Sequence, residues 1–563
     1  MWVCVGVCVC VCVFRLCLCL CLCLCVSVCL CVCVCVRVCA REYMVADFSR
    51  EGIDCKNHAH HTMPPADVPA PLAALLNWAR EHGGHFSESL EVRVGSRGRG
   101  VFATAPIKHG DLLVRLPFSA AVRPTSGCER LKELCEGGEC SSVLALALTV
   151  LHELHVASPR TAYFEDLAAA PPPGVPLLWP EEDVMRLAGS SLLPTKDGDS
   201  AAAKAAAAVA AAAATASFEE DVRPVMTAVG IEYLPPKVCT QTFFFGALAW
   251  VMSRGLQGRV SYELGSHSFC PCLSASGPQG SAVGPFHLPL FDLLNHSSHE
   301  AQRCTTLARA NDGDAFEMRA KRDLSVGEEA LWSYGSHGAA ELLRTYGFVE
   351  SSRNPYSTVM LTREEVAAAA VANSASLKEQ PGDAKTAEAR IQALEKAGRL
   401  PVVFTLRSDG DGNVTKVPEE LLTAVQVLVM SKEEFGEWLA AGSIALGEGF
   451  LDEESLGGVV GCLLKISDSC LQRYPSAKAF SSGSSSHSSL GLMCKALKEE
   501  ERQLILEFKK AVFLLAVAEE DVGEEGEEEE LLEEEEEEDE EDEEDEEPAQ
   551  DTRQAKKRRI DLA

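Results

Sequence analysis

Amide, imidazole and phenol side chains gather in one stretch of the sequence, between residues 291 and 348. The stretch opens on Phe291-Asp292-Leu293-Leu294-Asn295-His296-Ser297 and later contains Tyr334-Gly335 and Tyr346-Gly347-Phe348. We interpret the Asn-His pair as the end of an apolar strand that begins at Leu288, and each Tyr-Gly as a turn. Polar groups of these kinds among apolar neighbours suit a small polar ligand held in a mostly dry pocket.

Short strands and a block of helices must position this stretch. Residues 90–94 and 101–103 alternate as strands around the glycine-rich turn 95–100, and 112–117 is another strand. Residues 141–240 are largely helical in pattern, and an apolar helix over 243–252 leads to Ser253-Arg254. Residues 261–285 are rich in Gly, Ser, Cys and Pro and predict a loop. Strands with helices inserted as a block indicate an α+β domain.

Beyond about residue 360 the apolar pattern is almost entirely helical. Five segments have a helical period, and they predict a second, all-α domain: 363–372, 385–398, 417–441, 455–473 and 490–517. The alanine tract at 201–215 has high helix propensity but little to pack, so we interpret it as a low-complexity expansion in an exposed helix or loop.

The two ends of the chain differ in composition from its body. Residues 1–40 alternate Val or Leu with Cys, and we interpret 1–65 as a non-functional leader and linker with Met44 a plausible start. A membrane anchor is disfavoured there, because residues that alternate with a period of two indicate a β-strand, and a single strand cannot span a bilayer. The run 519–547 holds 24 acidic residues and no Lys or Arg, so residues 518–563 are expected to be disordered.

Charge and cysteine usage narrow the possible functions. The formal net charge is −33, but without the acidic run it would be −9, and the body shows no basic stretch suited to nucleic acid. Of 25 cysteines, 14 lie in residues 1–40 and the others do not form a disulfide framework. Cys270 and Cys272 make a single close pair without a second cluster, so no metal site is expected. The basic end 556–559 suits either a nuclear localisation signal or a charge-balanced tail.

The ordered series of these motifs resembles a SET-domain methyltransferase, and more narrowly the class typified by the Rubisco large-subunit lysine methyltransferase. The series runs Gly98-Arg99-Gly100, helical insert, Ser253-Arg254, Asp292 to His296, Gly327-Glu328-Glu329, Tyr334-Gly335 and Tyr346-Gly347-Phe348. The resemblance covers about residues 66–517. It implies a SET domain over 66–355 with an insertion at about 120–255, then a substrate-binding domain over 356–517.

The resemblance also implies a fold, a cofactor and roles for individual residues. It implies small β-sheets around a knot-like crossing of the Asn-His segment and the chain after Tyr334-Gly335, with S-adenosylmethionine on one side and the acceptor lysine on the other. Tyr334 would border the transferred methyl group. The residues expected to contact the cofactor are Arg99, Gly100, Arg254, Asp292, Asn295, His296 and Tyr334. The residues expected to line the substrate channel are Leu256, Phe291, Tyr346 and Phe348.

Three functions fit these residues. The leading hypothesis is a monomeric, S-adenosylmethionine-dependent protein-lysine N-methyltransferase of a non-histone protein, because pre- and post-SET zinc cysteines are absent. A protein-histidine methyltransferase is a second, although the apolar Leu256 and Phe291 favour lysine. A third is a non-catalytic SET-fold module that binds basic partners. Cytoplasm or nucleus is favoured over chloroplast, and the identity of the substrate is not encoded in any motif.

Overall fold

A computed structural model describes residues 69–536, with gaps at 171, 196–199, 259–282, 311–312, 375–383, 400, 402, 409–416, 441–452 and 475–488. The leader, the Cys270/Cys272 pair and the basic end lie outside the described residues. The chain divides into two compact units, each with its own core. The first comprises the chain through Asn354 together with 483–497, and the second comprises 355–482 with 498 onward.

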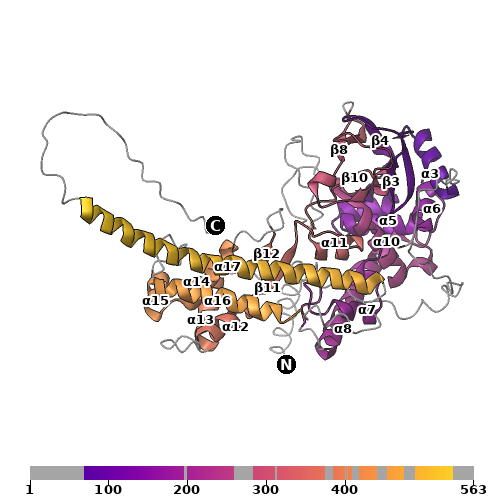
Figure 1. Cartoon of the computed structure of the whole chain (residues 1–563). Helices are drawn as coiled ribbons and strands as arrows, with labels where there is room; N and C mark the ends of the chain where they lie inside the picture. Colours follow the sequence, from indigo (N-terminus) through magenta and orange to yellow (C-terminus); the bar gives the residue numbers. More distant parts are fainter. Residues whose placement is uncertain are drawn as a thin grey trace, which may run out of the picture. The chain divides into compact units, whose positions relative to one another are not determined.

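The strands of the first unit, several of which are labelled in Figure 1, pair mostly in antiparallel fashion. Its largest sheet has the order β1-β4-β9-β8, formed by His85–Phe86, Leu112–Pro117, Ala315–Ala320 and Thr305–Arg309. A separate hairpin pairs β2 (Leu90–Gly95) with β3 (Gly98–Ala103). Ser96 and Arg97 make its turn, and Gly98 follows at a φ of 87°, a conformation that glycine adopts without strain. The glycine-rich segment therefore serves as a tight hairpin turn.

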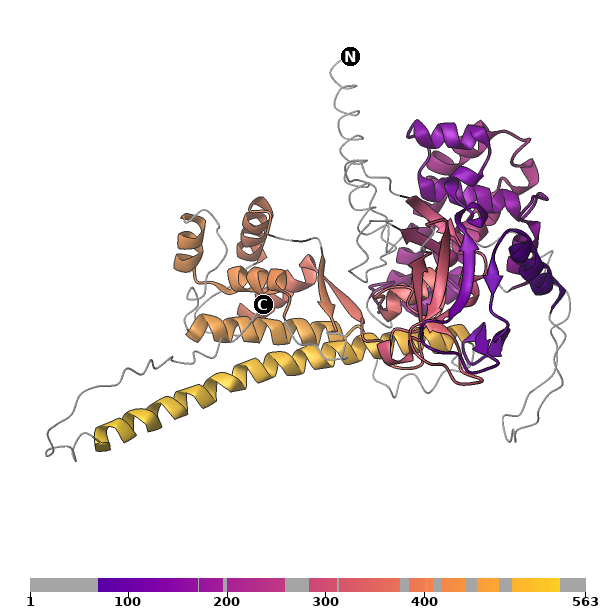
Figure 2. The ribbon, with the colours of Figure 1, turned by 90° about the horizontal axis from the view of Figure 1, so that it is seen from above.

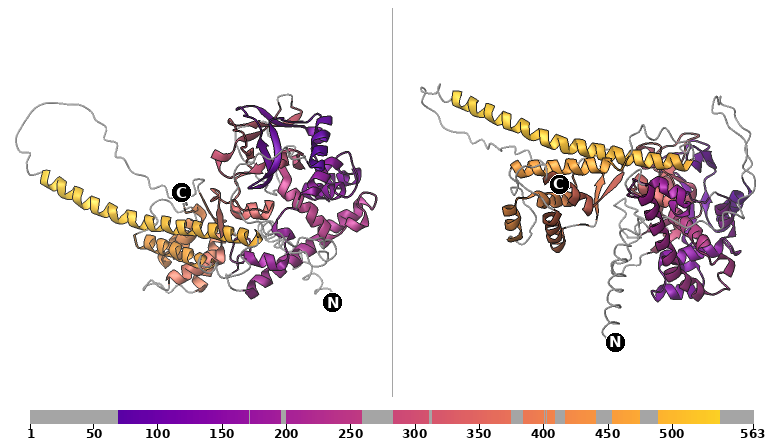
Figure 3. Two further views of the ribbon diagram at one scale, coloured as in Figure 1. Left: turned by 45° about the vertical axis from the view of Figure 1, so that its right-hand side comes forward. Right: turned by 90° about the horizontal axis from the view of Figure 1, so that it is seen from below.

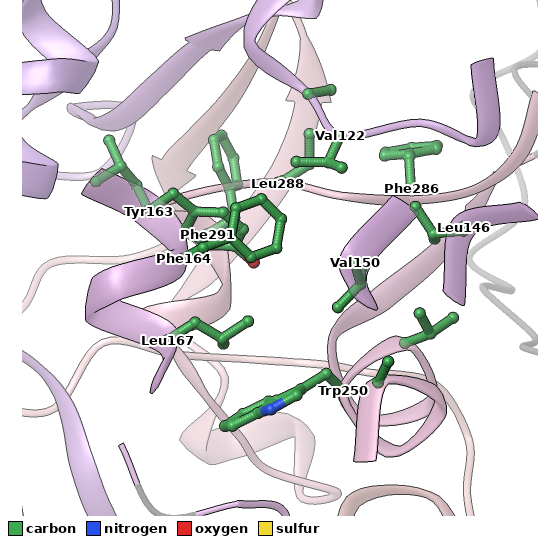
Figure 4. Packing of buried hydrophobic residues seen from close by; sticks show 14 of the residues in the cluster. Val122, Leu146, Val150, Tyr163, Phe164, Leu167, Trp250, Phe286, Leu288 and Phe291 are labelled. Carbon is green, nitrogen blue, oxygen red and sulfur yellow. The ribbon is translucent and has the colours of Figure 1, made fainter. Parts of the chain in front are cut away.

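Most helices of the first unit lie in the predicted insertion, which Figure 2 shows in purple and magenta beside the strands, and Figure 3 from two more sides. Helix α3 (Ala70–Glu81) precedes the strands. The main insertion helices are α4 (Glu129–Glu136), α5 (Ser142–Glu153), α6 (Thr161–Ala169), α7 (Glu181–Val184), α8 (Ser200–Ser217), α9 (Arg223–Val229) and α10 (Gln241–Arg254). Side chains of α5, α6 and α10 pack with Phe286 and Phe291 in the main core, as Figure 4 shows.

The alanine tract is better packed than the sequence predicts. In α8, Ala203, Ala207, Ala210 and Ala214 are buried and recur at helical spacing. The segment from Ala201 to Val229 is long and apolar enough to cross a membrane, but these alanines instead pack within the first unit. The prediction of an exposed helix holds for most of the tract but missed these four buried alanines, whose small side chains let one face of the helix approach its neighbours closely.

The segment around Asn295 differs from the expected strand. The strand here is β6 (Val283–His287), which pairs with β5 (Gly255–Gly258), so the predicted loop 261–285 runs into a strand. Residues 288–291, expected to be extended, turn sharply because Leu290 has a φ of 75°, and Phe291–Leu293 is a 3-10 turn. Asn295–His296 is then itself a strand, β7. The sequence did not reveal this turn, because residues 288–291 are three apolar residues and a proline, without the Gly, Asn or Asp that usually marks a turn.

Strand β7 is the centre of the predicted crossing. It pairs in parallel with β10 (Leu331–Trp332), with Leu331 opposite Asn295 and Trp332 opposite His296. After helix α11 (Ala339–Tyr346) the chain returns to the same place, where Ser298 N donates to Glu350 Oε1 at 3.0 Å and Asn354 Nδ2 to Ser298 Oγ at 3.1 Å. Segments distant in sequence are thus brought together around the Asn-His pair.

The second unit is mostly helical but is not all-α. Its strands β11 (Thr358–Thr362) and β12 (Val403–Arg407) form an antiparallel pair, which the expectation of an all-α domain missed. Each strand is only five residues long, and the two stand 40 residues apart, so the sequence has no hairpin signal. The helices are α12 (Arg363–Ser374), α13 (Ala384–Lys396), α14 (Glu419–Val429), α15 (Lys432–Ala440), α16 (Glu453–Leu471) and α17 (Ser489–Glu536).

Two helix boundaries also differ from prediction. The segment 417–441 is two helices, because Ser431 and Glu434 form a reciprocal capping box that starts α15. Helix α17 continues through Glu536, into the acidic run that was expected to be disordered. Glutamate and leucine have high helix propensity, and extending an existing helix needs no new nucleus.

Candidate functional site

A cavity of about 540 Å³ lies in the first unit and contains most of the predicted site residues. Its volume is in the range of small-molecule pockets. Residues from both sides of the crossing line it, together with the β2–β3 turn and helices α6 and α10. The predicted residues that line it are Arg99, Arg254, Leu256, Phe291, Asp292, Asn295, His296, Tyr334, Tyr346 and Phe348.

Gly100 is the one predicted residue that does not line the cavity, and it has a different role. A Cβ atom at this position would lie 2.4 Å from Glu329 Oε1 and 2.7 Å from Asn295 Nδ2. The missing side chain leaves room for Asn295 Nδ2 to donate to Glu329 Oε1 at 2.8 Å and to Arg99 O at 3.1 Å. Gly100 therefore positions Asn295 and lies behind the pocket wall.

His296 is a buried neutral imidazole. Its Nδ1 accepts a hydrogen bond from Tyr334 N at 2.9 Å, so the proton is on Nε2, which lies 3.0 Å from Ser298 Oγ. Burial lowers the pKa of His296 to about 3. The ring adds no positive charge to the cavity, and its Nδ1 holds the backbone N–H of Tyr334 in place.

Tyr334 lies between the strands and the aromatic wall. Its hydroxyl donates to Leu294 O at 2.8 Å, and its ring centroid is 4.8 Å from that of Tyr346. Burial raises the pKa of the Tyr334 phenol. The group is thus held as a neutral phenol whose oxygen keeps its lone pairs for a further donor.

Arg254 and Asp292 form an ion pair on the pocket wall. Arg254 Nη1 lies 3.4 Å from Asp292 Oδ2 and donates to Asp292 O at 2.7 Å. Only 6% of the Asp292 side chain is exposed, and Oδ1 has no partner among the described atoms. Burial raises the pKa of Asp292, which the Arg254 charge opposes. Buried polar atoms usually have a hydrogen-bond partner, so Oδ1 is an exception within this wall.

Arg99 binds a residue that sequence reasoning did not place in the site. Its Nη2 donates to both carboxylate oxygens of Asp166, at 2.7 and 2.8 Å. Asp166 and Tyr163 lie on helix α6, three residues apart and therefore on one face. Such i, i+3 spacing of a Tyr and an Asp was visible in the sequence but is common on any helix.

The remaining wall is aromatic and apolar. Leu256, Phe291, Tyr346 and Phe348 line it as predicted positions, and Phe291 is also fully buried in the core. Trp250 and Trp332 join them, and neither was predicted. Trp332 was hidden because its register, opposite His296, depends on the long-range pairing of β7 with β10.

Comparisons with known proteins agree with this geometry. A family model described as SET domain matches residues 98–335. The N-lysine methyltransferase setd6 of Xenopus laevis is 23% identical over 387 residues, covering 65% of this chain and 76% of that protein. The Ribosomal lysine N-methyltransferase 4 of Saccharomyces cerevisiae is 23% identical over 273 residues, covering 46% of this chain and 51% of that protein. The structure of Rubisco LSMT bound to AdoMet matches with a TM-score of 0.54 and 17% identity, covering 80% of this chain and 93% of that one.

The fold and the crossing define a SET domain followed by a largely helical second unit. Residues 98–335 match the SET-domain family, and the chain is similar in sequence to N-lysine methyltransferases and in fold to the Rubisco large-subunit methyltransferase class of SET-domain proteins. The cofactor of this class is S-adenosylmethionine. Among the residues that the structure describes, no group of three or more His, Cys, Asp or Glu side chains could hold a metal ion.

The residues around the cavity fit that cofactor. S-Adenosylmethionine carries a planar adenine, a sulfonium cation and an amino-acid group, and the cavity offers aromatic faces for the first two. The Arg254–Asp292 ion pair on the same wall offers charged groups for the amino-acid portion. A wall combining aromatic rings with a buried carboxylate therefore suits a cationic ligand.

Proposed function

We propose that this protein is a protein-lysine N-methyltransferase that uses S-adenosylmethionine and acts on a non-histone protein. The observation that carries the proposal is the placement of Tyr334 beside the Asn295–His296 strand, in a cavity lined by Arg254, Asp292 and aromatic rings. The named lysine methyltransferases among its relatives support the acceptor.

The bound cofactor would supply an activated methyl group, and the chain's own residues would supply alignment and a suitable environment. Arg99, Arg254, Asp292, Asn295 and His296 would hold the cofactor. Methyl transfer to an amine is an in-line displacement, whose rate depends on holding the two reactants in the correct geometry.

The protein must also provide a lysine nitrogen without its proton. An apolar channel disfavours the ammonium form and lowers the pKa of an entering lysine. Leu256, Phe291, Tyr346 and Phe348 would form this channel.

Tyr334 would orient the acceptor nitrogen. Its hydroxyl donates a hydrogen bond to Leu294 O, so the phenol oxygen can still accept a hydrogen bond from the lysine nitrogen. A neutral phenol can accept a hydrogen bond without binding the ammonium form tightly. Burial keeps the phenol protonated, because it raises the pKa.

Labelled methyl transfer tests this proposal. The full chain and a Tyr334→Phe variant are incubated with tritiated S-adenosylmethionine and a cell extract, with purified core histones as a separate substrate. We expect labelled non-histone bands whose labelling falls about 100-fold in the variant, as expected when an aligning contact is lost. Tyr233→Phe is the matched control, since Tyr233 stacks on His152 within the insertion and does not line the cavity.

Three outcomes would contradict the proposal. Labelling that does not depend on Tyr334 would remove its assigned role, and labelling confined to histones would overturn the substrate class. Mass spectrometry of the labelled protein identifies the acceptor, and methylhistidine in place of methyllysine would replace the lysine assignment with the histidine alternative.

A further inference from the structure

Four polar side chains form a buried row that begins at the cavity and ends in the core. Arg254 pairs with Asp292, Tyr163 Oη donates to Asp292 Oδ2 at 2.8 Å, and His287 Nδ1 lies 3.2 Å from Tyr163 Oη. Tyr163 is 1% exposed and His287 is fully buried. Figure 4 shows the Tyr163 ring packed in the same apolar cluster as Phe291.

The protons in this row have one consistent arrangement. A phenol has a single hydrogen, and that of Tyr163 goes to Asp292, so Tyr163 Oη must accept from His287. His287 is therefore the neutral tautomer with its proton on Nδ1. Its Nε2 is a buried lone pair without a partner among the described atoms. Burial lowers the pKa of His287 to about 3 and raises that of Tyr163, so both stay neutral.

This arrangement makes Tyr163 a directed donor to one carboxylate oxygen. Oδ2 of Asp292 is occupied by Tyr163 and Arg254, whereas Oδ1 has no partner among the described atoms. A hydrogen bond from a neutral group to an ionised one is short and strong compared with a neutral pair. Without that donor, the carboxylate could rotate or take up a proton, since burial already raises its pKa.

We propose that Tyr163 and His287 are positioning residues that hold Asp292, and through it Arg254, in the orientation needed to bind the cofactor. His287 orients the Tyr163 hydroxyl, and Tyr163 orients the carboxylate. The inference rests on the proposed function, because it assigns the cavity to S-adenosylmethionine. It gives the insertion a role in the site, since Tyr163 lies on α6.

A double-mutant cycle tests whether Tyr163 acts through Asp292. The dissociation constant of S-adenosylhomocysteine is measured by calorimetry for the full chain and for Tyr163→Phe, Asp292→Asn and the double variant. We expect Tyr163→Phe to weaken binding about ten-fold, the size of effect that follows loss of a hydrogen bond to a charged group. In the Asp292→Asn background the same change should alter affinity less than two-fold, because coupled residues are not additive.

The cycle separates positioning from packing. A Tyr163→Phe variant that binds within two-fold of the unmodified chain overturns the inference, as do effects that multiply in the double variant. Tyr233→Phe is the control for loss of a tyrosine hydroxyl away from the cavity and should bind normally. If the unmodified chain itself fails to bind S-adenosylhomocysteine, the proposed function fails first, which is a distinguishable result.

A pair of His287 variants provides a second, independent measurement. Asparagine can place an N–H donor where Nδ1 of histidine lies, whereas leucine cannot. We expect His287→Asn to keep affinity within about three-fold and His287→Leu to weaken it about ten-fold. Melting temperatures without ligand show whether each variant folds. Equal affinity of the two folded variants would contradict the role of His287.

Discussion

Single residues in this site are fixed by close contacts that leave little freedom. Gly100 is the clearest case, because Asn295 and Glu329 occupy the space where its side chain would be. Leu290 is another, since its φ of 75° turns the chain from β6 toward β7. Asn295 and His296 owe their positions to such neighbours as much as to their own strand pairing.

Gly100→Ala should disrupt the Asn295–Glu329 hydrogen bond. Its Cβ would lie 2.4 Å from Glu329 Oε1, so that side chain must move. We expect a loss of about 1–3 kcal/mol in stability, typical of overpacking, together with weaker binding of S-adenosylhomocysteine. Gly246→Ala in α10 is the control, because no atom lies within 4 Å of the added Cβ. Equal melting temperatures and affinities for the two variants would contradict this account.

The buried histidines predict how stability depends on pH. The folded-state pKa values of His287 and His296 are about 3, below the ordinary 6.5, so the unfolded chain binds more protons between these values. Stability should therefore fall as pH drops below about 6.5, by up to about 1.4 kcal/mol per pH unit for each histidine.

Denaturant unfolding between pH 7.5 and 5 checks this dependence. Replacing His296 with Asn should reduce the pH slope relative to the unmodified chain, whereas His85→Asn, at an exposed position, should not. Asp292 has a raised pKa, so its effect on the pH dependence of stability is opposite to that of the histidines. This effect cancels when the slope of a variant is subtracted from the slope of the unmodified chain. An unchanged slope in the His296 variant would show that this group is not buried as a neutral ring.

At the scale of elements, the site depends on close approach between segments remote in sequence. Helix α11 ends at Tyr346, and Gly347, with a φ of 80°, caps it in the left-handed conformation. Its Cα lies so close to Gly174 that an added Cβ would be 2.6 Å from Gly174 C. This contact joins the wall formed by Pro172, Pro173 and Gly174 to the Tyr346–Phe348 wall.

Gly347→Ala should separate these two walls. The change combines a left-handed conformation with a backbone clash, and we expect it to cost at least about 2 kcal/mol. Binding of S-adenosylhomocysteine should weaken in parallel, because both walls line the cavity. Thermal unfolding and calorimetry measure the two effects, with Gly246→Ala again as the control. Normal stability would mean that the two loops are not held together here.

At the scale of the whole molecule, the first unit is not continuous in sequence. Residues 483–497 belong to it, and Cys494 and Leu497 of α17 are buried in a cluster with Leu187 and Leu343. A chain cut after Asn354 would lack these two side chains. The SET unit therefore depends on residues about 140 positions beyond its apparent end.

Leu497→Ala in the full chain tests this dependence. Leu497 is fully buried, and truncating a buried leucine to alanine typically costs about 2–5 kcal/mol. We expect a lower melting temperature, partly restored by saturating S-adenosylhomocysteine, which binds only the folded form. Leu492→Ala is the matched control, because Leu492 on the same helix is 56% exposed. Equal effects of the two substitutions would contradict the assignment of 483–497.

Much of the architecture follows from patterns that are local in the sequence. Helical period and glycine punctuation predicted α5, α10, the β2–β3 hairpin and most helices of the second unit. The ordered motifs placed the SET domain and brought ten of the eleven predicted site residues to one cavity. These features can be predicted from the sequence because each depends on residues that lie within a single helix, strand or hairpin.

Only the tertiary structure decided the features that depend on long-range contact. The β11–β12 pair and the register of Trp332 required partners tens of residues away, and the turn at Leu290 has no local sequence signal. Likewise, Tyr163 and His287 are 124 residues apart and become neighbours only when the insertion packs against β6. The sequence by itself determined which chemistry the chain carries. Packing decided which side chains hold that chemistry in place, because burial and hydrogen-bond geometry are properties of the folded chain.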